Sequence, residues 1–235
     1  MERTLHDVPM DYIEKPIPGI PVVSIWIGQQ NRKFLAPQKD RFQGICPSAY
    51  TAMFNEICKK YSLICDTSNV TPKIDYSMFD IHKIDKFLST IRKPCVIVSN
   101  TQVLSGQAGG KVCASPTYMD FIIDHLKPHF TVVTTKDRRK EGEYFIGNIV
   151  RRSDEDLSEL SYLSTKSYGI IGRSSGPYVF SIVEENFNGP LQMICLTLDK
   201  EGVYWETATN THWLRINEEK KFILTQISKF LNIGI

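Results

Sequence analysis

Residues 168–177 read YGIIGRSSGP, and this stretch decides the fold. The apolar run 168–171 is typical of a short strand that is covered on both faces. A turn of small residues follows without a gap, and Pro177 has the fixed φ angle that suits a first helical position. The stretch therefore predicts a strand, a tight turn and a helix in immediate succession.

The same succession occurs elsewhere in the chain. Apolar runs predict further strands at 95–99 (CVIVS), 130–134 (FTVVT), 148–150 and 191–197 (LQMICLT). Helical spacing of apolar residues predicts helices at about 47–62, 84–91, 116–126, from 153 past 163, 177–187 and 217–232. Because strands and helices alternate, we expect an α/β fold: a Rossmann-like parallel sheet with helices on both faces.

This regular alternation begins only at Pro94. The residues before it contain one strand-like run, at 21–28, and two helical patterns, which is too little for a second complete lobe. We therefore expect a reduced N-terminal region over residues 1–92 and a Rossmann-like domain over 93–235.

Composition narrows the function classes. The formal charge of +2 gives no strong electrostatic case for nucleic acid, and no apolar run approaches the ~18 residues of a membrane span. The six cysteines show neither a CxxC pair nor zinc spacing, so we expect no zinc site, unpaired thiols and a cytoplasmic location. No motif of the sequence requires a metal, and we expect no cofactor. The basic run 136–140 (KDRRK) is interpreted as a solvated loop.

The turn after residue 171 is the strongest candidate for a binding site. Backbone N–H groups at a strand-to-helix turn are free to bind an anion, and glycines at 172 and 176 would allow a close approach of the ligand. The alternative is an ordinary turn capped by serine. The residues expected to contact a phosphate are Arg173, Ser174, Ser175, Gly176, Pro177 and Tyr178.

The segment 148–183 resembles the C-terminal, donor-binding lobe of GT-B glycosyltransferases, and is most similar to the lipopolysaccharide heptosyltransferase family. In that family a helix L-x-E-L-x-x-L precedes a strand and an Asp-Ser-Gly-Pro turn that holds the donor diphosphate. The preceding elements follow in the family's order, so the resemblance covers roughly residues 94–198. The matching positions are Leu157, Glu159, Leu160 and Leu163 in the helix and Ser175, Gly176 and Pro177 in the turn.

The resemblance implies a glycosyltransferase, of hexosyl- or heptosyltransferase type, that moves a sugar from a nucleotide-sugar donor to an acceptor hydroxyl without a bound metal. Residues 93–235 would then be the nucleotide-sugar-binding domain. The chain has Ser174 where the family has an aspartate and Val179 where it has a histidine. Two alternatives therefore stay open: a non-catalytic nucleotide- or sugar-phosphate-binding protein, and a GT-B-related sugar-nucleotide epimerase.

Two more loops follow predicted strands and are expected at the same end of the sheet. In the first, Asn100, Ser105, Gln107 and Lys111 would face the sugar or the phosphates, unless the loop is simply a glycine-rich surface loop. In the second region, Thr135, Asp137 and Glu155 would bind the base and the ribose. An acidic residue in a first helical turn also balances the helix dipole, which is the competing interpretation of Glu155.

The general base for an acceptor hydroxyl must be an Asp, Glu or His in the cleft. Four residues of the N-terminal part qualify, and the sequence does not choose among them: Asp40, Asp75, Asp80 and His82. His125 and His129 are interpreted as structural. His212, beside Trp213, is interpreted as part of a surface loop, and the alternative is that it covers the cleft.

Overall fold

The computed structural model describes residues 55, 58–59, 61–64, 72–101, 116–150, 157–173, 176–187, 189–197, 210–216 and 218–234. The chain forms two compact units. One unit consists of Thr71–Leu104, Gly110–Gly202 and Ala208–Ile235 and holds all the described strands. Predictions for residues 1–54, including the strand at 21–28 and the candidate base Asp40, lie outside the described residues.

The strands form one parallel sheet. In chain order they are β1 (Cys95–Val98), β2 (Thr131–Thr134), β3 (Tyr144–Phe145), β4 (Gly169–Gly172), β5 (Gln192–Thr197) and β6 (Thr211–Arg215). Their spatial order is β3-β2-β1-β4-β5-β6, and every neighbouring pair is parallel. This is the strand order of the doubly wound, dinucleotide-binding fold, so the predicted Rossmann-like α/β class is confirmed.

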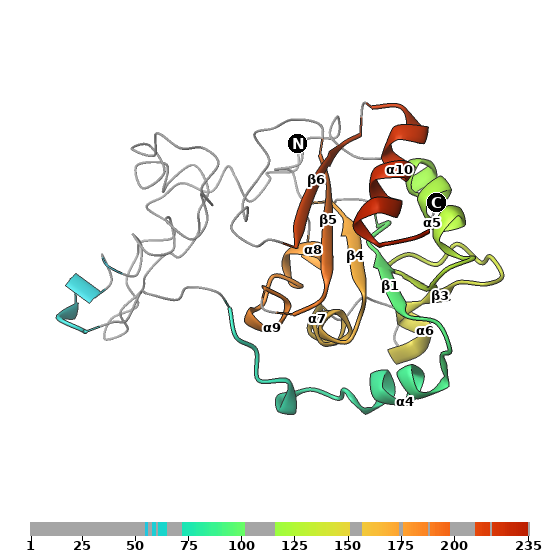
Figure 1. Ribbon diagram of the computed structural model, residues 1–235. Helices are drawn as coiled ribbons and strands as arrows, with labels where there is room; N and C mark the ends of the chain where they lie inside the picture. The colour runs from blue at the N-terminus through green and yellow to red at the C-terminus, as the bar shows by residue number, and fades with distance from the viewer. Residues whose placement is uncertain are drawn as a thin grey trace, which may run out of the picture. The chain divides into compact units, whose positions relative to one another are not determined.

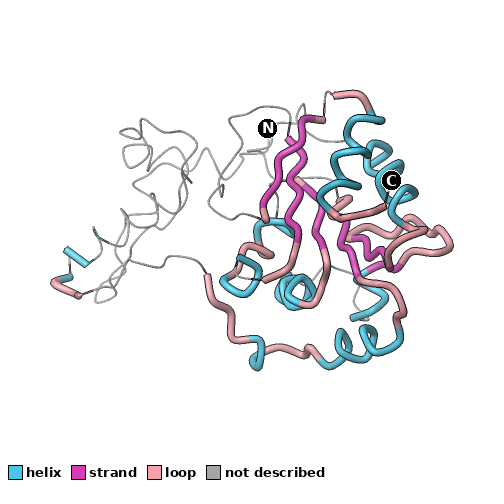
Figure 2. Tube along the Cα trace, in the orientation of Figure 1, coloured by secondary structure: helices cyan, strands magenta, loops and turns pink. Residues whose placement is uncertain are grey.

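Helices cover both faces of the sheet (Figures 1 and 2). Figure 1 shows α5 and α10 beside each other, and His125 of α5 contacts Ser228 of α10 at 2.8 Å between Nε2 and Oγ. The helical segments are η3 (Tyr76–Met78), α4 (His82–Thr90), α5 (Pro116–Leu126), α6 (Ile146–Val150), α7 (Leu157–Thr165), α8 (Gly176–Val179), α9 (Glu184–Phe187) and α10 (Lys220–Phe230).

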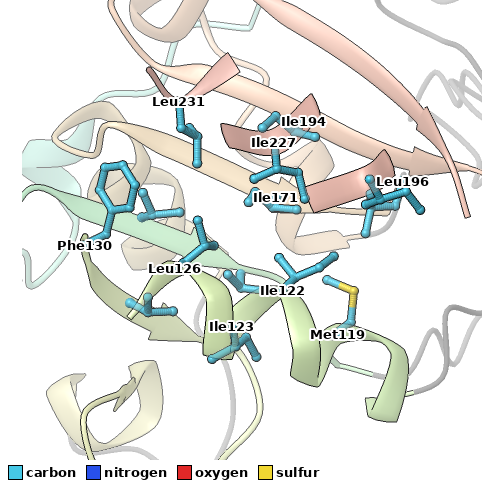
Figure 3. Packing of buried hydrophobic residues seen from close by; sticks show 14 of the residues in the cluster. Met119, Ile122, Ile123, Leu126, Phe130, Ile171, Ile194, Leu196, Ile227 and Leu231 are labelled. Atoms are coloured by element: carbon cyan, nitrogen blue, oxygen red, sulfur yellow. The ribbon is translucent and has the colours of Figure 1, made fainter. Parts of the chain in front are cut away.

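The main apolar core lies between α5, α10 and the sheet (Figure 3). Strand residues Val98, Ile171 and Ile194 enter this core, and each is fully buried. Helix α10 contributes Ile223 and Ile227, which are one turn apart and also fully buried. The residues that alternate with them along the strands, such as Ile97 and Ile170, are buried on the other face. Burial on both faces explains the unbroken apolar runs of the sequence.

Two predicted elements differ from the structure. The prediction of a strand at 148–150 is wrong: α6 begins at Ile146, and its buried residues Ile146 and Val150 are spaced by one helical turn. The single helix predicted at 177–187 is also wrong, because it is split into α8 and α9. Between them the backbone tightens to i+3 hydrogen bonds, and a side chain takes the carbonyl of Ser181: Asn186 Nδ2 donates to it at 2.7 Å.

Two described strands were not predicted from the sequence: the two-residue strand β3 and the longer strand β6. Residues 211–215 (THWLR) form edge strand β6, so the placement of His212 in a surface loop is wrong. Its ring stacks on Phe230 with centroids 3.8 Å apart, Nε2 lies 2.9 Å from Gln192 Oε1, and burial lowers the pKa of His212. A polar composition hid this strand because only Leu214 reaches the core deeply.

The described cysteines behave differently from one another. Cys95 and Cys195 lie in β1 and β5, are buried, and form no disulfide; burial raises the pKa of Cys95 to about 12, opposed by a hydrogen bond with Ser167. Cys58 is disulfide-bonded, so the expectation of unpaired thiols is wrong there. Unpaired thiols were the argument for a cytoplasmic location, and the disulfide of Cys58 removes that argument. None of the described helices is long and apolar enough to cross a membrane.

Replacing Ile227 with alanine should lower the free energy of unfolding by about 2–5 kcal/mol, because the side chain is fully buried in the core shown in Figure 3. Phe222→Ala on the same helix is the matched control: its side chain is 47% exposed, so its effect should stay within about 0.5 kcal/mol. Urea unfolding of both variants measures this. Equal losses would show that α10 does not pack as described.

Candidate functional site

The strand order reverses between β1 and β4, which are neighbours in the sheet although β2 and β3 intervene in the chain. In open parallel sheets ligands bind outside the carboxyl ends of the strands at this reversal. The residues that follow β1, β2 and β4 therefore meet at one edge. Among the predicted site residues, Asn100, Thr135, Asp137 and the turn beginning at Arg173 belong to this edge.

Strands β1 and β4 approach each other very closely here. A Cβ placed on Gly172 would lie 2.7 Å from the Cβ of Ser99, a distance that real side chains do not reach. The backbone N–H of Ser99 also donates to the Ile171 carbonyl at 2.8 Å. Glycine at 172 is thus required by its neighbour strand. The sequence analysis had ascribed its small size to the approach of a ligand.

Asn100 joins the ends of β1 and β2. Its Oδ1 accepts hydrogen bonds from the backbone N–H groups of Thr135, at 3.0 Å, and Lys136, at 2.8 Å. Its Nδ2 donates to the Lys136 carbonyl at 3.2 Å, and the residue is only 3% exposed. The side chain that was predicted to face the donor therefore braces two loops against each other.

Thr135 belongs to the same brace. The Thr101 hydroxyl lies 2.6 Å from Thr135 Oγ1, and the Thr101 N–H donates to that same oxygen at 3.2 Å. Asp137, in contrast, is exposed, and its Oδ1 accepts from the Arg139 N–H at 2.8 Å in a local turn. Of the predicted base- and ribose-binding residues, Thr135 is buried and Asp137 is open to solvent.

The turn after β4 divides into exposed and buried parts. Gly176 is exposed, and among the described residues a Cβ built on it would meet the Leu157 side chain, at ordinary distances of 3.7 Å to Cδ1 and 3.8 Å to Cδ2. Pro177 and Tyr178 point into the protein. The Tyr178 hydroxyl has no hydrogen-bond partner among the described residues, and burial, followed by the nearby Cys195, raises its pKa well above the usual value. Arg173 is half-buried at the start of the turn.

The remaining predicted site residues lie outside the described residues: Ser105, Gln107, Lys111, Glu155, Ser174 and Ser175. Of the candidate bases, Asp75 caps η3 by accepting from Ser77 N and Oγ, which lowers its pKa. Asp80 contacts His82 and, at 3.3 Å, Lys83. The hydrogen bond with His82 is the main reason why the pKa of Asp80 is lowered.

The sequence analysis missed Arg138 as a buried anchor inside the basic run 136–140. Its side chain is 7% exposed and pairs with Asp120 at 3.0 Å, Asp124 at 2.8 Å and Glu143 at 3.2 Å. Glu143 is 4% exposed; burial raises its pKa, and Arg138 opposes that rise. The interpretation of this run as a solvated loop is therefore wrong for Arg138. The two aspartates one turn apart on α5 were the available signal.

Arg138 fixes the connection that carries Asp137. Residues 135–143 link the parallel strands β2 and β3 and contain no helix. Such connections usually need a helix to cross back over the sheet. Here the ion pairs of Arg138 hold the loop against α5 instead. Arg138 thus holds the far part of the loop, while Asn100 holds its first residues, Thr135 and Lys136.

Replacing Asn100 with alanine should lower the free energy of unfolding of the unliganded protein by about 1–3 kcal/mol. The backbone N–H groups of Thr135 and Lys136 would lose their acceptor at a buried position. Asn100→Asp keeps the acceptor oxygen and should lose less. Thermal unfolding without any ligand measures both. An unchanged unfolding temperature of Asn100→Ala would show that these hydrogen bonds do not stabilise the fold.

Arg138→Ala should lower the free energy of unfolding by about 3–5 kcal/mol, because Glu143 would stay buried without its partner. Lys136→Ala, in the same basic run but exposed, should change it by no more than about 0.5 kcal/mol. Urea denaturation distinguishes the two. A small effect of Arg138→Ala would mean that its ion pairs do not hold the loop.

Comparison with protein-family models gives no match, and comparison with curated protein sequences gives none either. Among solved structures, the fold is similar to the crystal structure of the glycosyl transferase family 9 protein from Veillonella parvula DSM 2008, with 11% sequence identity and a TM-score of 0.45. The similarity covers 86% of this chain and 55% of that one, so the chain spans little more than half the length of that protein. A likeness at this level concerns the fold, and it assigns no activity, substrate or site residue to this chain.

Proposed function

We propose that this protein binds the diphosphate of a nucleotide-sugar at the carboxyl edge between β1 and β4 and transfers the sugar to an acceptor hydroxyl. The observation that carries the proposal is the reversal of strand order at this edge, in a sheet with the order β3-β2-β1-β4-β5-β6. The resemblance of residues 94–198 to a GT-B donor lobe supports the identity of the ligand. Residues 93–235 would form the donor-binding domain.

In the proposed reaction, negative charge builds on the diphosphate as the bond to the sugar breaks. Backbone N–H groups of the turn after β4 would stabilise this charge, and such stabilisation is usually the largest contribution of a protein to a step of this kind. Arg173, at the end of β4, is the described cation nearest in sequence to the turn. A base from the N-terminal part would take the proton of the acceptor hydroxyl.

A second candidate function is binding without catalysis. Two residues favour it: Ser174 and Val179 stand where the resembling family has an aspartate and a histidine. Val179 is 37% exposed on α8 and carries no group that could exchange a proton. A related sugar-nucleotide epimerase is a weaker candidate, because the predicted site offers few carboxylates.

Nucleoside diphosphates should stabilise the protein against heat, and Gly176→Val should abolish this stabilisation. A ligand at 100 times its Kd contributes about 2.7 kcal/mol to the folded state. The added methyl groups would fill the space in front of the turn, while the new Cβ finds an ordinary contact with Leu157. Thermal unfolding with ADP, GDP, UDP and CDP and with their sugar derivatives provides the measurement.

Gly234→Val is the matched control, because a Cβ on Gly234 meets no atom of the described residues within 4 Å. It should keep the full ligand-induced shift, and both variants should unfold near the wild-type temperature without ligand. If Gly176→Val binds as wild type does, the turn is not the phosphate site. Release of free nucleoside diphosphate from a bound donor, with transfer to an acceptor, would separate the transferase from the binding protein.

A further inference from the structure

Four residues form a row across β1, β4, β5 and β6 that starts at the carboxyl ends of β1 and β4. Gly172 is paired with Cys195, and Cys195 with Trp213, across β4, β5 and β6. Ser99, directly after β1, completes the row by its contact with Gly172. Residues that are paired across parallel strands point to the same face. The row therefore lies on the face opposite Ile171 and Ile194, away from the core of Figure 3.

Two polar groups of this row, the Ser99 hydroxyl and Trp213 Nε1, have no hydrogen-bond partner among the described residues, and Ser99 is the one that lies at the reversal of strand order. The residue is 4% exposed, and its Oγ has no hydrogen-bond partner among the described residues. Buried hydroxyl groups are almost always paired, because a missing hydrogen bond costs folding free energy. A buried serine hydroxyl without a hydrogen-bond partner, at the point where the strand order reverses, therefore indicates that something outside the described residues accepts a hydrogen bond from it.

The polar neighbours of Ser99 are already engaged. Asn100 uses Oδ1 and Nδ2 on the backbone of Thr135 and Lys136. Thr101 and Thr135 are bonded to each other through their hydroxyl groups. The Ser99 backbone N–H is committed to Ile171. The neighbouring loop residues therefore hold one another in place and leave Ser99 Oγ as the donor that a ligand would find unused.

We propose that Ser99 Oγ donates a hydrogen bond to a phosphate oxygen of the ligand bound between β1 and β4. This inference rests on the proposed function and adds to it a residue from the β1 side of the site. A phosphate oxygen is an acceptor only, and it suits a hydroxyl whose surroundings offer no other acceptor. Glycine at 172 leaves room for the Ser99 side chain, because a Cβ there would lie 2.7 Å from Ser99 Cβ and 3.4 Å from Ser99 Oγ.

The test is Ser99→Ala, with the unfolding temperature measured without ligand, with the nucleoside diphosphate that stabilises wild type most, with inorganic pyrophosphate, and with the corresponding nucleoside. Without ligand the variant should unfold at the wild-type temperature or above, because it loses an unpaired buried hydroxyl and no hydrogen bond within the described residues.

Affinity for the diphosphate and for pyrophosphate should fall about ten-fold, as expected for a hydrogen bond to a charged group. Affinity for the nucleoside should stay unchanged.

Thr211→Val is the matched control. Thr211 Oγ1 is also buried without a partner among the described residues, but Thr211 begins β6, at the opposite end of that strand from the carboxyl edge. This variant should bind all three ligands as wild type does.

If wild type binds the diphosphate and Ser99→Ala binds it equally well, the role of Ser99 is overturned while the proposed function stands. Loss of nucleoside binding in Ser99→Ala would also overturn the assignment to phosphate. If no nucleotide or pyrophosphate stabilises wild type, the proposed function fails, and the role of Ser99 fails with it.

Discussion

The pairing of β1 with β4 is the constraint on which the rest of the sheet depends. It joins the half made of β3, β2 and β1 to the half made of β4, β5 and β6. At the carboxyl end the two strands are so close that Gly172 has no room for a side chain beside Ser99. Because β1 is followed by β2 in one half and β4 by β5 in the other, the connectivity alone favours a crevice between the loops that follow them.

The polar residues at this edge fall into two kinds. Asn100, Thr101 and Thr135 are satisfied by one another and by nearby backbone, so they make the edge rigid before any ligand arrives. Ser99 is buried and left without such a partner among the described residues. A rigid frame lowers the ordering cost of binding, while an unpaired donor makes binding itself favourable. A polar residue near a site can therefore be structural, and an apparently structural one can face the ligand.

The sequence predicted the parallel sheet because strands buried on both faces are continuous apolar runs, as at 95–98 and 169–172. It failed where that signal is absent. β6 is an edge strand with polar residues, α6 buries only a short helical face, and α8 and α9 are separated by side-chain hydrogen bonds that no periodicity reveals. The edge that would carry the site was predictable from strand ends. The bracing role of Asn100 was not, because it depends on the backbone of residues 135 and 136.

The two buried thiols have a practical consequence. Cys95 lies in β1 and Cys195 in β5, one in each half of the sheet. A thiol in such surroundings, with a pKa of about 12 for Cys95, is inert toward alkylating reagents until its strand is exposed. The rate at which each cysteine is alkylated thus reports how often its own half of the sheet opens. Labelling rates at the two positions would tell whether the sheet opens as one body or parts along the line between β1 and β4.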